Sequence, residues 1–165
     1  MEIVYIETSV VSLLVGHPSR DLLTAANQQV TRDWWRVRRQ DFFCVASDVV
    51  RQEAAKGDPE QVRRRLQVLR ELTFVEPPPR AEVLSLAFLA TGALPPKAQT
   101  DAAHLAIATA AGADYLLTWN CRHLANAQIL RRLEREALSR GWTLPKVCTP
   151  AELMGDSPYE DESDS

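Results

Sequence analysis

The chain has 165 residues, of which 45% are hydrophobic and 25% charged, as is ordinary for a single globular domain. We find no apolar run long enough to span a bilayer and no N-terminal signal peptide, so we expect a cytoplasmic protein that does not contact a membrane. The cysteines, Cys44, Cys121 and Cys148, are odd in number and far apart, which argues against a disulfide framework and indicates a reducing compartment.

The net charge of −3 conceals an uneven distribution of charge. Residues 156–165 carry five acidic and no basic side chains, and we expect them to form a disordered tail after a domain of residues 1–155. The domain then holds 19 basic and 17 acidic side chains. Its arginines cluster within 36–39, 63–65 and 131–135, which is typical of a face that binds a phosphate backbone and equally of solvated helix faces.

Short apolar runs alternate with longer helical segments along the chain. Because most of the runs lack a polar alternation, they indicate a central parallel sheet with helices on both faces, an α/β fold of the three-layer α/β/α sandwich type. The first and fourth strands are expected near the centre of the sheet. The expected strands are 3–6, 42–47, 73–76, 114–119 and 146–149. The expected helices are an interrupted segment after residue 7, then 21–40, 48–56 with Ser47 as N-cap, 58–72, 80–91, 100–111 and 123–140.

The first expected strand ends in an abrupt change of chemistry, in the stretch VYIETSVVS. Glu7 follows the apolar run directly and is itself followed by the hydroxyl residues Thr8 and Ser9. In open parallel sheets, ligands bind beyond the carboxyl ends of the strands. Asn120 comes just after the fourth expected strand, so it and Glu7 are predicted to lie at the same edge of the sheet.

Two further carboxylates occur on helices that belong to the core. Glu53 shares a helix face with Val49 and Val50, where an unpaired carboxylate would cost several kcal/mol. Asp101 opens an alanine-rich helix and, taken alone, is more typical of a capping residue. Together with the strand-end residues, however, these acids form a group that would repel unless a cation neutralised it. Mg²⁺ and Mn²⁺ accept such oxygen ligands and assist phosphodiester hydrolysis, so the pattern predicts a metal site.

Four segments, VYIETSVVS, SDVVRQEA, TDAAHLAIA and YLLTWNCRHLAN, resemble in order and spacing the motifs of PIN-domain nucleases. The closest likeness is to VapC-like toxins of type II toxin–antitoxin pairs, and it covers about residues 3–154. The resemblance implies a PIN-like fold and a metal-dependent endoribonuclease that hydrolyses RNA. It also implies a homodimer that is inhibited by a small antitoxin protein.

Carried over by position, the resemblance assigns the family's acidic residues to Glu7, Glu53, Asp101 and, at a fourth position, Asn120. These residues would bind Mg²⁺ or Mn²⁺, with Glu53 acting through water or positioning the attacking water. The chain departs from the family in having Glu rather than Asp first and a neutral amide fourth, which leaves open a catalytically silent PIN domain that binds RNA or a protein partner. Candidate substrate contacts are Thr8, Ser9, Thr118, Arg122 and His123.

The histidines near these motifs allow two interpretations each. His104 shares a helix face with Asp101 and could be its hydrogen-bond partner, but a satisfied structural histidine is the better interpretation. His123 would either contact a phosphate or cap a helix. The neighbouring Arg122 is a candidate phosphate ligand, because a guanidinium binds such oxygens in a forked geometry. A small-molecule enzyme on the same kind of sheet is disfavoured, because no Gly-rich loop follows the first strand.

Overall fold

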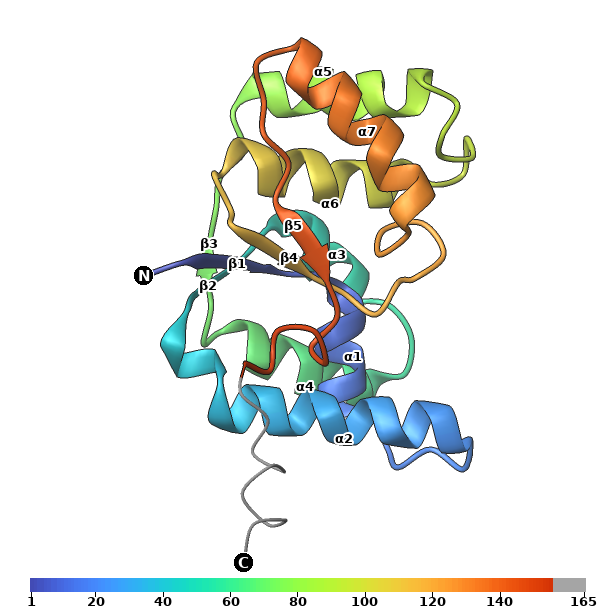
Figure 1. Cartoon of the computed structure of the whole chain (residues 1–165). Helices are drawn as coiled ribbons and strands as arrows, with labels where there is room; N and C mark the ends of the chain where they lie inside the picture. Colours follow the sequence, from blue (N-terminus) through green and yellow to red (C-terminus); the bar gives the residue numbers. More distant parts are fainter. Residues whose placement is uncertain (156–165) are drawn as a thin grey trace, which may run out of the picture.

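The computed structural model describes residues 1–155, and the expected acidic tail lies outside the described residues. All of the strands are parallel and belong to one five-stranded sheet (Figure 1). They are β1 (Ile3–Ile6), β2 (Phe43–Ala46), β3 (Thr73–Phe74), β4 (Tyr115–Leu117) and β5 (Lys146–Cys148). The order across the sheet is β3-β2-β1-β4-β5, so β1 is central and β4 is its neighbour, as the sequence predicted.

Helices cover both faces of the sheet, which confirms the predicted α/β/α sandwich (Figure 1). One layer contains α1 (Thr8–Val15), α2 (Leu22–Val37) and α4 (Pro59–Leu69), and a 3-10 turn, η1 (Arg39–Asp41), follows α2. The other layer contains α5 (Pro79–Ala90), α6 (Gln99–Ala110) and α7 (Ala127–Ser139). The short helix α3 (Asp48–Ala54) contacts α1 and α4 on one side and α6 on the other, so it joins the two layers.

The central strand shows why this sequence forms a sheet that is buried on both faces. Val4, Tyr5 and Ile6 are all fully buried, although they alternate between the faces of the sheet. Burying such side chains contributes roughly 1.5–3 kcal/mol each, which offsets the conformational entropy lost on ordering the strand. The observed strands occupy the predicted positions but are one to three residues shorter, except for β1, which has the predicted bounds.

Local side chains set the helix ends, and the largest error in the prediction is the start of the last helix. The side chain of Asp58 accepts a hydrogen bond from the Gln61 N–H and caps α4 as its position suggested. The last helix, in contrast, begins at Ala127 and not at 123, because Asn126 is its N-cap and accepts from the Ile129 N–H. Residues 121–124 form turns instead. No helix within residues 1–155 is long and apolar enough to cross a bilayer.

Candidate functional site

The carboxyl ends of β1 and β4 place two of the predicted site residues next to each other. The strands pair in parallel register with Ile6 opposite Leu117, and the Glu7 N–H donates to the Leu117 carbonyl at 3.0 Å. Glu7 is therefore level with Thr118 at the edge where both strands end. The residue is only 5% exposed, so Glu7 is held within the protein.

The carboxylate of Glu7 is bound through one of its two oxygens. Oε2 accepts hydrogen bonds from the Ser9 N–H at 3.0 Å and from Thr118 Oγ1 at 2.8 Å, and the Ser9 hydroxyl also donates to it. The contact with the Ser9 N–H makes Glu7 the N-cap of α1. Within the described residues Oε1 has no hydrogen-bond partner. One oxygen thus fixes the side chain, and the other is available to a ligand.

Glu53, like Glu7, is bound through only one of its two carboxylate oxygens. It lies on α3, and its Oε1 accepts from Thr8 Oγ1 at 2.6 Å and from His104 Nε2 at 2.5 Å. Burial raises the pKa of the Glu53 carboxyl, but the hydrogen bonds from His104 and Thr8 outweigh it, so that the net pKa lies below its ordinary value. The side chain is therefore a carboxylate at neutral pH, and Oε2 has no partner within residues 1–155.

Behind Glu53, a chain of hydrogen bonds runs into the core. His104 Nδ1 lies 2.8 Å from the Tyr5 hydroxyl, which in turn lies 2.7 Å from Ser47 Oγ. Burial raises the pKa of the Tyr5 hydroxyl far above its ordinary range, so it remains protonated. The prediction of a satisfied structural histidine is confirmed, but its predicted partner, Asp101, is wrong, because its partners are Glu53 and Tyr5. Ser47 stands at the N-cap position of α3 without making the predicted side-chain cap.

Asp101 forms a second group with residues of the loop after β4. Its Oδ1 accepts from Asn120 Nδ2 at 3.1 Å, and its Oδ2 lies 3.0 Å from His123 Nδ1. The Asn120 amide oxygen accepts from the His123 N–H at 3.0 Å. This pattern settles the orientation of the amide, because a carboxylate only accepts and a backbone N–H only donates. Asn120 thus orients Asp101, and His123 contacts Asp101 rather than capping a helix.

The two groups are joined at Thr118. Its Oγ1 donates to Glu7 and accepts from the Asn120 N–H at 2.9 Å. Glu7, Asn120 and Asp101 therefore belong to one continuous set of hydrogen bonds around the ends of β1 and β4. Glu53 belongs to a separate set with Thr8 and His104. Of the three predicted hydroxyl contacts to substrate, Thr8 donates to Glu53, while Ser9 and Thr118 donate to Glu7.

The donor atoms of this site suit a divalent cation. One carboxylate oxygen of Glu7, one of Glu53 and one ring nitrogen of His104 lie within 4.8 Å of one another. Because His104 is fully buried and both its nitrogens have partners, we assign the ligand role to the two carboxylates, whose second oxygens are free. Two carboxylates this close repel each other, and a hard cation would relieve that repulsion. The residues present therefore fit Mg²⁺ or Mn²⁺.

Sequence reasoning missed two members of the site, Tyr5 and Ser47. A signal was present, because a tyrosine within an otherwise aliphatic buried strand must find a hydrogen-bond partner for its hydroxyl. The sequence did not show that this partner would be His104, which lies on helix α6. Arg122, the predicted phosphate ligand, is exposed next to Asn120, as that role requires.

The arginine clusters are only partly available to a polyanion. Arg63 and Arg64 both contact Glu60, and Arg65 donates to the carbonyl oxygens of Ala54 and Lys56. The cluster within 63–65 thus stabilises α4 and its junction with α3. This arrangement favours the interpretation as a helix face over that as a phosphate-binding surface.

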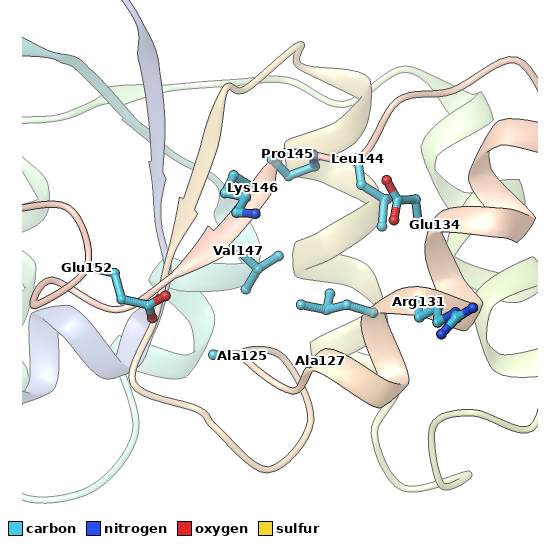
Figure 2. Close-up of a pocket in the computed structure, with 10 residues that line it drawn as sticks. Ala125, Ala127, Arg131, Glu134, Leu144, Pro145, Lys146, Val147 and Glu152 are labelled. Atoms are coloured by element: carbon cyan, nitrogen blue, oxygen red, sulfur yellow. The ribbon is translucent and has the colours of Figure 1, made fainter.

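A cavity of about 510 Å³ lies between β5 and α7, away from the acidic site (Figure 2). Figure 2 shows Arg131 and Glu134 entering it from α7, and Lys146 from β5. The charged side chains that line the cavity are two basic ones, Arg131 and Lys146, and two acidic ones, Glu134 and Glu152. Their charges cancel, so the cavity offers no net attraction for a phosphate backbone. None of the predicted site residues lines this cavity.

No family model matches the chain, and no curated protein matches it either. The interpretation of the site therefore depends on its geometry and on the resemblance of its motifs.

Proposed function

We propose that this protein is a divalent-metal-dependent endoribonuclease of the PIN type, similar to VapC-like toxins. The observation that supports the proposal best is the arrangement of Glu7 and Glu53. Each carboxylate has one oxygen fixed by protein donors and the other free. One oxygen of Glu7 lies within 4.8 Å of one oxygen of Glu53, at the carboxyl edge of a parallel sheet. Ligands bind at this edge in folds of this kind.

Glu7 and Glu53 would hold Mg²⁺ or Mn²⁺, which when bound supplies charge neutralisation for a phosphodiester and a more acidic water. Asp101, for which the resemblance also implied a ligand role, has partners on both carboxylate oxygens and would border the site. The protein's own contribution is to keep these carboxylates in place. Asn120, whose oxygen already accepts from the His123 N–H, orients Asp101 rather than ligating the ion. The free Oε2 of Glu53 would accept a hydrogen bond from the attacking water and so direct it at the phosphorus atom.

The proposal implies particular partners. The substrate would be RNA, with the exposed Arg122 near a phosphate oxygen. A VapC-like protein would also form a homodimer and bind a cognate antitoxin protein in the cytoplasm. A small open reading frame that overlaps the start of this one in its genome would support the toxin assignment.

Cleavage of a pool of structured and single-stranded RNA tests this function directly. The wild type and Glu7→Gln would be compared with Mn²⁺, with Mg²⁺ and with EDTA. We expect cutting that requires metal and falls by at least ~10²-fold in the variant, because an amide removes the charge while keeping the shape.

Glu60→Gln is the matched control, because it removes the same charge from an exposed residue of α4 that contacts only arginines. It should cut like the wild type. If folded wild-type protein free of inhibitor cuts no RNA with either metal, the nuclease proposal fails. A catalytically silent domain that binds RNA or a protein would then be the better interpretation.

A further inference from the structure

The two carboxylates of the site are fixed by different kinds of donor. Glu7 is held by Ser9 and Thr118, which adjoin it in the chain or in the sheet. Glu53 is held by Thr8 and by His104, whose imidazole is fully buried. A neutral aromatic side chain would fill the same space in the core, so the polar ring calls for an explanation beyond packing.

We propose that His104 is a positioning residue, which fixes Oε1 of Glu53 so that Oε2 is the oxygen presented to the cation. The inference rests on the proposed function, since it assigns a role to the same site. It explains why the histidine meets the half-buried carboxylate of Glu53 and not Asp101, which lies one turn away on its own helix.

The direction of the hydrogen bond follows from the acceptor. A carboxylate has no hydrogen to donate, so the Nε2 atom of His104 carries the hydrogen and donates it to Glu53, whether or not the ring is charged. With the second donor, Thr8 Oγ1 at 2.6 Å, Oε1 has two hydrogen bonds. Rotation of the carboxylate would break both, so its free oxygen keeps one direction.

The ring of His104 is itself anchored at the other end. Nδ1 contacts the Tyr5 hydroxyl at 2.8 Å, and that hydroxyl contacts Ser47 Oγ at 2.7 Å. His104 and Tyr5 are fully buried, and Ser47 is 1% exposed. Tyr5 lies on the central strand β1, and Glu7 directly follows the end of that strand. The contact with Tyr5 therefore fixes Glu53 relative to the strand that also positions Glu7. The two carboxylates are thereby positioned relative to each other.

Two amide substitutions separate the two contacts of the ring. The amide of His104→Gln reaches about as far as Nε2 and keeps a donor for Glu53, whereas that of His104→Asn reaches only as far as Nδ1 and keeps the contact with Tyr5. The readouts are Mn²⁺ affinity by calorimetry and RNA cleavage over a Mn²⁺ series. We expect the Asn variant to bind Mn²⁺ about 10–100-fold more weakly than the wild type, and the Gln variant to retain affinity within a few-fold.

Thr109→Val is the matched control, because Thr109 is buried on the same helix and its hydroxyl donates only to the Leu105 carbonyl. It should lose stability and keep Mn²⁺ affinity. If His104→Asn does not fold by near-UV circular dichroism, Tyr5→Phe provides the second test. That variant releases the ring while keeping its size, and we expect several-fold weaker Mn²⁺ binding.

Equal Mn²⁺ affinities in the Gln and Asn variants would overturn the positioning role, and the nuclease proposal would stand if the wild type still cut RNA. Mn²⁺ binding by the wild type without cleavage, with the expected order of the variants, would support the role of His104 and overturn the nuclease. A wild type that binds no Mn²⁺ would overturn both.

Discussion

The Glu7–Glu53 pair and the Asp101–Asn120–His123 group lie at the same edge of the sheet but satisfy their carboxylates differently. In the pair, each carboxylate uses one oxygen for protein donors and leaves the other free. In the Asp101 group, both carboxylate oxygens have partners. Asp101 also lies in the first turn of α6, where the helix dipole favours a negative charge.

This difference indicates a division of labour. The Asp101 group is electrostatically complete, because an amide, an imidazole and a helix terminus surround one charge. The Glu7–Glu53 pair is incomplete, because two carboxylates come close and each has one oxygen without a hydrogen-bond partner within residues 1–155. A site that binds a divalent ion requires free carboxylate oxygens, as in the Glu7–Glu53 pair. The Asp101 group, whose oxygens are already hydrogen-bonded, can form the border of such a site.

Neutral substitutions at Glu53 and Asp101 test this comparison most strongly. In Glu53→Gln the amide oxygen can still accept from Thr8 and His104, but the NH₂ group then takes the place of the free oxygen. We expect Mn²⁺ affinity to fall by about 10²-fold. In Asp101→Asn the bonds to Asn120 and His123 can be kept, and we expect a loss of about 10-fold. Calorimetric titration with Mn²⁺ measures both.

The order of these two effects is the informative result. If Asp101→Asn costs more affinity than Glu53→Gln, the Asp101 group is the principal ligand, and the division of labour described above is wrong. Glu60→Gln again serves as the control for the loss of one negative charge.

Removing the Thr118 hydroxyl, which joins Glu7 to the Asp101 group, should lower Mn²⁺ affinity less than these substitutions do. It should clearly lower the free energy of unfolding. In Thr118→Val, Glu7 loses one donor and the Asn120 N–H loses its acceptor, within a fully buried position. We expect the free energy of unfolding to fall by about 1–3 kcal/mol, as measured in urea.

Thr91→Val is the matched variant, because the Thr91 hydroxyl also donates once and accepts from a backbone N–H, that of Ala93, but far from the site. It should lose some stability with unchanged Mn²⁺ affinity. A Thr118→Val protein with the same Mn²⁺ affinity as Thr91→Val would show that the two groups act independently.

The smallest expected effect is a dependence of stability on pH through Glu53. Its pKa is lowered in the folded protein, so its contribution to stability is complete above its unfolded value of about 4.3 and is lost as the pH falls through the folded value. The difference in unfolding free energy between the wild type and Glu53→Gln should therefore decline once the pH falls below about 4.3. A difference that stays constant down to pH 3 would contradict this assignment.

The sequence predicted the sheet well because β1 consists of side chains that only a doubly covered strand can bury. It predicted the start of α7 poorly, because Leu124 is buried and extends the apolar pattern backwards. Two asparagines place the start of α7 later than the apolar pattern suggests. Asn120 accepts from the His123 N–H and forms a turn, and Asn126 caps the helix. Side-chain contacts of this kind outweigh periodicity near helix ends.

The acidic residues of the site were predictable because their charge conflicts with their apolar surroundings. The partners of His104 were not, because helical spacing relates residues within one helix, and Glu53 and Tyr5 approach from a different helix and from the sheet. The role of Ser47 was misjudged for a related reason. The serine stands at the N-cap position of α3, but its hydroxyl contacts the Tyr5 hydroxyl at 2.7 Å and makes no hydrogen bond to the helix terminus.

The missing side-chain cap at Ser47 has a consequence for motion near the site. Helix α3 has seven residues and begins without a side-chain cap, so its first N–H groups lack the partner that commonly delays fraying. Fraying of this first turn should not reach Glu53, because Val50 and Ala54 of α3 are fully buried and Glu53 is itself bound by Thr8 and His104. The Ser47 hydroxyl contacts the central strand and not the helix end, so motion at the start of α3 would be separated from the carboxylate that faces the ligand.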